Sequence, residues 1–232
     1  EGVIPVDPDT WLGTQSLAAA RFAAGAVCAG VDDVFTSSTR RVFCAVRPPG
    51  HHAERDSAMG FCLFNSVSIG ALKALQEYGA SRVAILDFDV HHGNGTVDIF
   101  KDQPEVLVCS TFQHPYYPNR QHDVIRPNII HSPLAAGTDG SGFRQAVEND
   151  WLPALAAHQP DLILVSAGFD AHALDPLAQL NLDNDDFVWV TQLIVDCAER
   201  YASGRVVSTL EGGYDLATLN SCVEDHLHAL NS

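Results

Sequence analysis

The chain has 232 residues, of which 46% are hydrophobic and 18% are charged, and these values fit one soluble globular domain with a sizeable core. The formal net charge of −16 argues against nucleic-acid binding and favours cationic partners, although an acidic surface can equally serve solubility alone. The longest apolar stretch, LAAARFAAGAVCAG, is interrupted by Arg21 and is too short to span a bilayer, so we expect no membrane insertion.

The cysteines and the N-terminal sequence bear on the cellular compartment. No basic segment followed by an apolar segment opens the chain, so no secretory signal is predicted. The chain starts at Glu1 rather than at a methionine, which leaves an upstream signal open. The cysteines lack CxxC spacing, so we interpret them as buried thiols of a reducing, cytoplasmic compartment. They are Cys28, Cys44, Cys62, Cys109, Cys197 and Cys222.

Apolar strands alternate with helical segments along the chain. Continuous runs of β-branched and apolar residues predict strands at 42–46, 82–88, 106–112, 162–168 and 205–210. Helices are predicted at 15–31, 65–78, 142–157, 185–202 and 215–230, and NLDNDDF offers capping residues before the fourth of them. This alternation predicts a single α/β domain over residues 1–232, with a doubly wound, mostly parallel sheet and helices on both of its faces.

Polar residues directly follow four of the five predicted strands. RPPGHHAE follows VFCAV, DVHHGNG follows VAILDF, FDAHALDP follows LILVSAG, and EGGYD follows VVSTL. In doubly wound sheets, ligands bind at the carboxyl ends of the strands. The sequence therefore predicts one composite site that is assembled from several strand ends.

A metal site is predicted within this composite site. Asp89 and His91 are two residues apart at a strand end, so in extended geometry their side chains point the same way. With Asp170 from another strand end, they make an N/O set suited to zinc, with an open position for water. A lone Asp-x-His pair is more often a surface loop, and the other clusters reverse that balance. The same ligands also suit Fe(II), which stays open.

The adjacent histidines after the Pro-Pro-Gly turn are acid–base candidates. His51 and His52 can supply a general base and a general acid near neutral pH if a partner orients each ring. Asp87 and Asn94 are the candidate partners, and a carboxylate favours a charged imidazole more than an amide does. Tyr214, after two glycines, is a candidate donor to a developing oxyanion beside the metal.

RPPGHHAERDSAMGFCLFN, LDFDVHHGNGT, SAGFDAHALDP and LEGGYD together resemble the zinc-dependent histone deacetylase family, in particular its class II and bacterial amidohydrolase members, which are related to acetylpolyamine amidohydrolases. The resemblance runs from about Asp7 to the C-terminus. It implies an arginase–deacetylase fold and a metal-dependent amidohydrolase that removes acetyl groups from acetyl-lysine or similar acylated amines. In that mechanism His52 shuttles protons and Tyr214 polarises the acetyl carbonyl. Asn94 stands where class I members carry an aspartate.

The resemblance also implies roles for further residues. The zinc ligands are Asp89, His91 and Asp170, and the catalytic set is His51, His52, Tyr214, Asp87 and Asn94. The substrate-binding set is Gly60, Phe61, Tyr117, Asp9 and Leu177, with Phe61 and Tyr117 as the aromatic walls of an acyl-lysine tunnel. The first potassium site comprises Asp87, Asp89, His91, Ser110 and Thr111. A second potassium site comprises Phe100, Gln103, Val106 and Asn128.

Comparison within the superfamily refines these expectations. The related arginases bind a second metal through an aspartate two positions after a ligand histidine, and Gly93 occupies that position here, which predicts one metal. Polyamine-selective relatives carry an acidic gate after an Asp-Pro turn. Leu177 follows Asp175 and Pro176 here, which predicts a preference for acetyl-lysine peptides. A first strand–helix unit of the family is absent, so we expect an N-terminally truncated or reduced domain.

Two alternative functions stay open from the sequence. One is an acetylpolyamine amidohydrolase, and the other is a metal-binding or acyl-lysine-binding module without turnover. The expected partners are acetylated lysine peptides, acetylated proteins or small acylated amines, and a homo-oligomer is left open. We interpret Asp175 as a brace for the Asp170 loop, and His172 could serve either the site or the structure. The histidines read as structural are His114, His122, His131, His158, His226 and His228.

Overall fold

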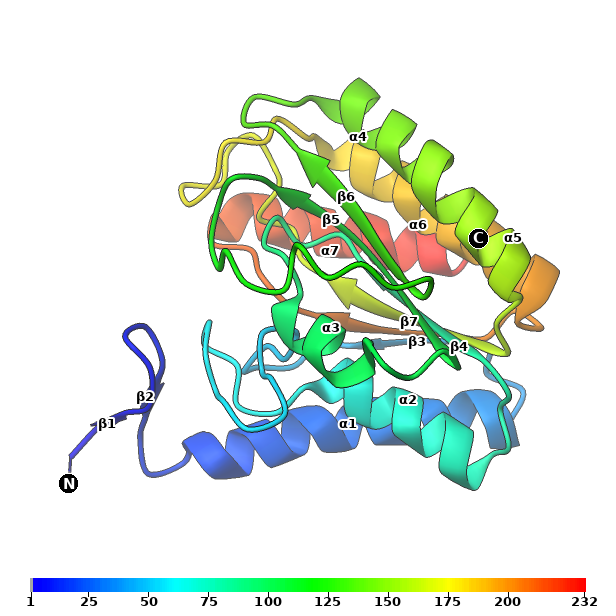
Figure 1. Ribbon diagram of the computed structural model, residues 1–232, viewed down its shortest axis with the longest axis horizontal. Coiled ribbons are helices and arrows are strands. Elements are labelled where there is room, and N and C mark those ends of the chain that lie inside the picture. Colours follow the sequence, from blue (N-terminus) through cyan, green and yellow to red (C-terminus); the bar gives the residue numbers. More distant parts are fainter. Residues whose placement is uncertain (1) are drawn as a thin grey trace.

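The computed structural model describes residues 2–232 and places a six-stranded parallel sheet between two layers of helices (Figure 1). The strands, in spatial order, are β3 (Arg41–Cys44), β8 (Val206–Leu210), β7 (Leu162–Ala167), β4 (Val83–Asp87), β5 (Val106–Gln113) and β6 (Ile129–Leu134). Every neighbouring pair is parallel. The last strand of the chain, β8, therefore lies between β3 and β7.

Helices cover both faces of the sheet (Figure 1). On one face lie α1 (Ser16–Thr36), α2 (Ser66–Glu77) and α3 (Asn94–Phe100). On the other lie α4 (Gly140–Ala146), a π-helical turn (Val147–Trp151), α5 (Leu152–His158), α6 (Asn184–Tyr201) and α7 (Leu216–Leu230). None of the helices described is long and apolar enough to cross a membrane.

The two faces of the central strand β4 contribute to separate cores. Val83 and Ile85 pack with α1, α2 and α3, whereas Ala84 and Leu86 pack with the helices of the opposite layer. Since successive strand residues point to opposite faces, a strand covered on both sides is expected to be mainly apolar, and β4 is apolar up to Asp87 at its carboxyl end. The predicted doubly wound α/β architecture is confirmed.

Several elements differ from the sequence expectation. The strand β6 was not predicted, because Pro133 and two polar residues interrupt its pattern, and a proline is tolerated there because β6 is an edge strand. The helix predicted at 142–157 contains the π-helical turn, which ends two residues before Pro153, a residue that cannot donate a regular helical hydrogen bond. The short α3 and a hairpin of β1 (Ile4–Pro5) and β2 (Trp11–Leu12) are further additions.

The thiols match the expectation of unpaired cysteines. All six are free, five of them are buried, and Cys28 is partly buried.

Candidate active site and metal centre

The four polar clusters lie together at the carboxyl ends of the strands. They follow β3, β8, β7 and β4, which are consecutive in the sheet and parallel, so that their carboxyl ends lie side by side. The topology therefore assembles the composite site that the sequence predicts, with each strand contributing one loop.

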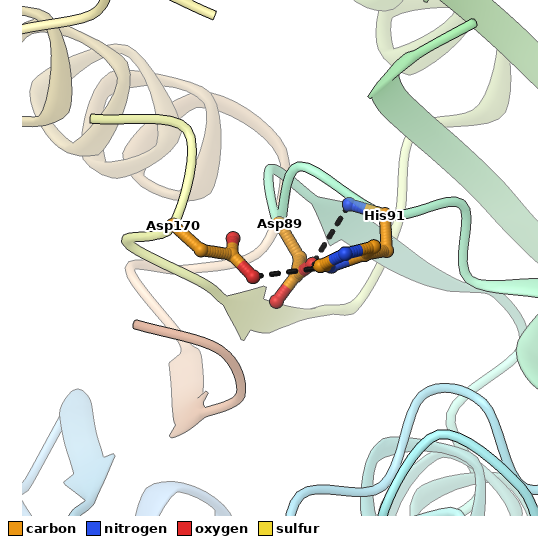
Figure 2. Close-up of side chains that lie close together, drawn as sticks. All are labelled: Asp89, His91 and Asp170. Atoms are coloured by element: carbon orange, nitrogen blue, oxygen red, sulfur yellow. Dashed lines mark hydrogen bonds and ion pairs between the residues drawn. The ribbon is translucent and has the colours of Figure 1, made fainter. Parts of the chain in front are cut away.

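Asp89, His91 and Asp170 converge on one point (Figure 2). Their ligand atoms lie within 4.8 Å of one another, and His91 Nδ1 is 3.0 Å from Asp89 Oδ1 and 3.1 Å from Asp170 Oδ2. All three residues are buried, and Asp170 Oδ2 accepts no hydrogen bond. A buried carboxylate oxygen without a donor is costly unless a cation balances it. The donor set therefore fits a divalent metal such as zinc.

Backbone groups hold the two carboxylates in place. Gly212 N donates to Asp89 Oδ2 at 2.8 Å, and Val90 N donates to Asp170 Oδ1 at 2.9 Å. A Cβ atom on Gly212 would lie 2.1 Å from Asp170 Oδ2, and one on Gly168 would lie 2.1 Å from Asp89 Oδ2. Glycine is required at both positions because the ends of β7 and β8 close directly against the carboxylates.

The electrostatics of this group also call for a cation. Burial, together with the neighbouring charge of Asp89, raises the pKa of Asp170 to about 6. Two carboxylates in a dry site disfavour each other's ionised form, and a bound divalent cation would stabilise both. Among residues 2–232, no other group of three potential ligands lies as close together.

His51 is paired with a carboxylate. Its Nδ1 lies 2.9 Å from Asp87 Oδ2. Burial alone would lower the pKa of His51, but the charges of Asp87, Asp89 and Glu211 outweigh burial and raise this pKa to about 10. A Cβ atom on Gly93 would lie 2.3 Å from Asp87 Oδ2, so the glycine lets this carboxylate approach the ring. Gly93, which stands where the arginases carry a ligand for a second metal, is therefore packed against Asp87.

His52 is paired with an amide. Its Nδ1 lies 2.7 Å from Asn94 Oδ1. Burial, together with the positive charge of His51, lowers the pKa of His52 well below 6.5. Since an amide oxygen only accepts, His52 donates from Nδ1, and its Nε2 keeps a free lone pair. The two neighbouring histidines thus occupy opposite protonation states, as a base and a charged group require.

Aromatic rings line the histidines and the metal triad, and the Tyr116 ring stacks on His91 at 5.5 Å, centroid to centroid. The Tyr117 ring stands edge-on to His52 at 5.3 Å and to His91 at 5.9 Å, centroid to centroid. The Phe61 ring, 43% exposed, lies 6.3 Å from Tyr214. Burial, together with the charges of Asp170 and Asp89, raises the pKa of Tyr214, which keeps its hydroxyl protonated as a donor.

The remaining predicted substrate residues lie around these rings. Gly60 has a positive φ of 56°, and a Cβ atom there would lie 2.2 Å from His52 Cδ2. Asp9 Oδ1 accepts from Gly60 N at 3.1 Å, which brings the N-terminal segment to the same turn. Asp175 accepts from Leu177 N at 3.0 Å and from Tyr214 N at 2.7 Å. Asp175 therefore ties its own loop, which carries Leu177, to the loop of Tyr214.

The residues of the two predicted potassium sites are differently arranged. The first set is wholly buried; the strand register pairs Asp87 with Ser110, and Ser110 Oγ has no hydrogen-bond partner. In the second set, Asn128 Nδ2 lies 2.9 Å from Phe100 O, 3.1 Å from Gln103 O and 2.9 Å from Val106 O. These carbonyl oxygens converge, but they surround a side-chain amide donor in this structure.

Sequence reasoning missed two buried carboxylates. Glu211 accepts from Gly50 N at 2.6 Å, from His51 N at 3.1 Å and from Ser166 Oγ at 3.0 Å, and burial raises its pKa to about 7. Glu54 accepts from Asn94 Nδ2 at 2.8 Å. Both lie inside the recognised motifs, in EGGYD and HHAE, so a search for unpaired acids next to the named residues could have found them.

Two histidines outside the predicted catalytic and metal-binding sets, His131 and His172, make contacts near the site loops. His131, interpreted as structural, contacts His92, with 3.2 Å between Nδ1 and Nε2, and approaches Val124 O at 3.0 Å through its own Nε2. His172 accepts from Leu174 N at 3.1 Å and stacks on Phe187, which makes it a structural residue of the Asp170 loop.

The fold and this site define an α/β hydrolase domain of the arginase–deacetylase type with a candidate metal site. The histone deacetylase domain profile matches residues 2–230, so the chain belongs to the histone deacetylase family. The "Histone deacetylase-like amidohydrolase" of Pseudomonas aeruginosa is 39% identical over 92% of this chain and 58% of its own length. The "Polyamine deacetylase HDAC10" of Mus musculus is 38% identical over 88% of this chain and 32% of its own length.

A solved structure agrees with the fold. The crystal structure of the HDA15 HD domain superimposes with a TM-score of 0.93 at 34% sequence identity, covering 98% of this chain and 65% of that chain. The chain thus spans from about one third to just under two thirds of the length of these three proteins.

Proposed function

We propose that this domain hydrolyses the acetyl amide of acetyl-lysine in peptides or proteins, with one zinc ion held by Asp89, His91 and Asp170. The observation that carries the proposal is that this triad lies beside two histidines with different partners. His51 is paired with the carboxylate of Asp87, and His52 is paired with the amide of Asn94. A bound zinc ion would polarise the acetyl carbonyl and lower the pKa of a water molecule.

The protein groups have separate tasks in this reaction. His52 Nε2, with its free lone pair, accepts a proton from the attacking water as the new C–O bond forms. The Tyr214 hydroxyl donates to the acetyl oxygen, on which negative charge develops. The C–N bond then breaks, and His52 passes its proton to the departing amine. His51, which Asp87 holds in its charged form, stabilises the developing charge nearby. The products are acetate and a free lysine amine.

The replacement His52→Ala tests this assignment. We expect a loss of about 10²–10⁴-fold in kcat on a fluorogenic acetyl-lysine peptide, because one general acid–base group is removed. The zinc content should be unchanged, since His52 is not one of the three ligands. Wild-type turnover by the variant would contradict the assignment. Stoichiometric zinc without hydrolysis of any acetyl amide by the wild-type protein would instead favour the non-catalytic binding module.

The substrate preference rests on Leu177. This side chain is 42% exposed on the loop that Asp175 anchors, and it offers no charge to the distal ammonium of an acetylated polyamine. We therefore propose that acetyl-lysine peptides are better substrates than N-acetylputrescine. The replacement Leu177→Glu should shift the ratio of the two kcat/KM values toward the polyamine. A wild-type preference for N-acetylputrescine that this replacement leaves unchanged would show that Leu177 does not set the choice.

Potassium binding belongs to the same proposal. The buried Ser110 hydroxyl without a partner, beside Asp87 in the strand register, favours a cation at the first predicted site. The second predicted site would require the Asn128 amide to turn its nitrogen away from the three carbonyl oxygens.

A further inference from the structure

The amide of Asn94 has two ends, and both are engaged. Its Oδ1 lies 2.7 Å from His52 Nδ1, while its Nδ2 donates to Glu54 Oε1 at 2.8 Å. The same Nδ2 also lies 3.3 Å from His52 O and 3.3 Å from Met59 Sδ. An amide can turn over and exchange its two ends, so the partner of Nδ2 decides which end His52 meets.

Glu54 is a buried carboxylate with a single cationic partner. Its side chain is 4% exposed, and its Oε2 lies 2.8 Å from an Arg120 guanidinium nitrogen. Arg120 lies three residues after Tyr117, in the connection between β5 and β6. A chain of polar contacts therefore runs from Arg120 through Glu54 and Asn94 to His52, and none of its first three members touches the metal triad.

The Glu54 carboxylate, at 2.8 Å the shorter of the two oxygen contacts of Asn94 Nδ2, sets the direction of the chain together with His52 O. A carboxylate only accepts hydrogen bonds, so Asn94 must present its NH₂ group to Glu54 and its oxygen to His52. His52 must then carry its proton on Nδ1, which leaves Nε2 unprotonated. Hydrogen bonds to a carboxylate are stronger than neutral ones, and burial strengthens them further, so this order resists reversal.

We propose that Glu54 is a positioning residue that fixes the tautomer of His52 through Asn94, with Arg120 as its counter-charge. The proposal rests on the function proposed above, in which His52 Nε2 accepts a proton. His51 contacts its carboxylate, Asp87, directly. His52 is linked to a carboxylate, Glu54, only through the amide of Asn94.

The replacement Glu54→Gln tests the proposal. The new amide must meet the Arg120 guanidinium and the Asn94 NH₂ with only one acceptor oxygen, so one contact in the chain fails. We expect kcat to fall between about 10-fold and 100-fold, below the cost of losing the base itself, with KM and zinc content unchanged. The matched control is Asp102→Asn, which removes a carboxylate paired with Arg126 at 3.1 Å on the surface and should leave kcat unchanged.

The exchange of the two groups, Glu54→Gln with Asn94→Asp, keeps the contacts that run from Arg120 to His52 Nδ1. It removes only the weaker contacts of Asn94 Nδ2, to His52 O and Met59 Sδ. The new glutamine oxygen accepts from Arg120, its NH₂ donates to the new aspartate, and that aspartate accepts from His52 Nδ1. We expect the double variant to recover most of the kcat lost by Glu54→Gln alone. A double variant that is worse than Glu54→Gln would overturn the proposal, as would a single variant that keeps the wild-type kcat or loses zinc.

NMR of the His52 ring nitrogens separates this proposal from the proposed function. Wild-type protein should show the tautomer protonated at Nδ1, with the signals assigned by their loss in His52→Ala, and Glu54→Gln should show a mixture of tautomers. If the wild-type protein shows no turnover but the tautomer changes in this way, the function fails and the positioning role stands. An unchanged tautomer in Glu54→Gln contradicts the positioning role whatever the activity.

Discussion

His226 is a buried neutral histidine, and its environment makes a quantitative prediction about stability. The residue lies on α7 with no exposed surface, surrounded by the rings of Phe43, Phe88 and Phe169. Its Nδ1 lies 2.7 Å from Thr191 Oγ1, and its Nε2 lies 2.9 Å from Ser208 Oγ. Burial lowers the pKa of His226 from 6.5 to about 3.

The sign and the size of the effect follow from linkage. The unfolded chain binds a proton at His226 near pH 6.5, whereas the folded protein does not until about pH 3. The stabilisation is therefore complete above pH 6.5 and is lost as the pH falls toward 3, by roughly 1.4 kcal/mol per pH unit. Between pH 7.5 and 4.5 the cost reaches about 3 kcal/mol, which is a large share of the stability of a typical domain.

Urea unfolding of the wild type and of His226→Gln at a series of pH values measures this cost. The variant lacks the titrating group, so its disadvantage at pH 7.5 should shrink or reverse by about 3 kcal/mol at pH 4.5. The control is His228→Gln, because that side chain is 79% exposed and its loss should leave the pH dependence unchanged. A constant difference between wild type and His226→Gln over the whole range would refute the reasoning.

Two further predictions concern the site. The replacement Gly212→Ala would place a Cβ atom 2.1 Å from Asp170 Oδ2, so zinc affinity measured by metal titration should fall about 10–100-fold, whereas Gly25→Ala, with no atom within 4 Å of its Cβ, should bind zinc normally. The replacement Tyr214→Phe removes the donor to the acetyl oxygen and should lower kcat about 10²–10³-fold in steady-state assays; an unchanged kcat would remove Tyr214 from the mechanism.

The sequence predicted the parts of the fold that burial dictates. The strands β4, β5 and β7 are buried along their whole length and are largely apolar, with polar residues concentrated toward their carboxyl ends, and long apolar runs of this kind are a pattern that a single sequence displays. The strand β6 lies at the sheet edge, where partial exposure permits polar residues and Pro133, so its pattern carried no signal. The short helix α3 begins inside a motif whose residues serve the site.

For the candidate site, the sequence predicted which residues come together but not which of their atoms are in contact. Its motifs follow adjacent parallel strands, so the grouping of Asp89, His91 and Asp170 followed from strand ends alone. Which atom faces which partner did not follow. The second partner of Asn94 and the convergence of three carbonyl oxygens on the Asn128 amide depend on side-chain rotamers and on packing between segments far apart in the chain.

The insertion of β8 between β3 and β7 has a consequence for biosynthesis. During translation β3 leaves the ribosome long before β8, and β3 and β7 have no shared partner until β8 arrives. Gly212, which donates to Asp89, and Tyr214 also follow β8. A nascent chain therefore carries an incomplete metal pocket until the residues that follow β8 have been made. Because the closing contacts span well over a hundred residues, sheet closure should be a slow folding step, and catalytic competence should appear together with it.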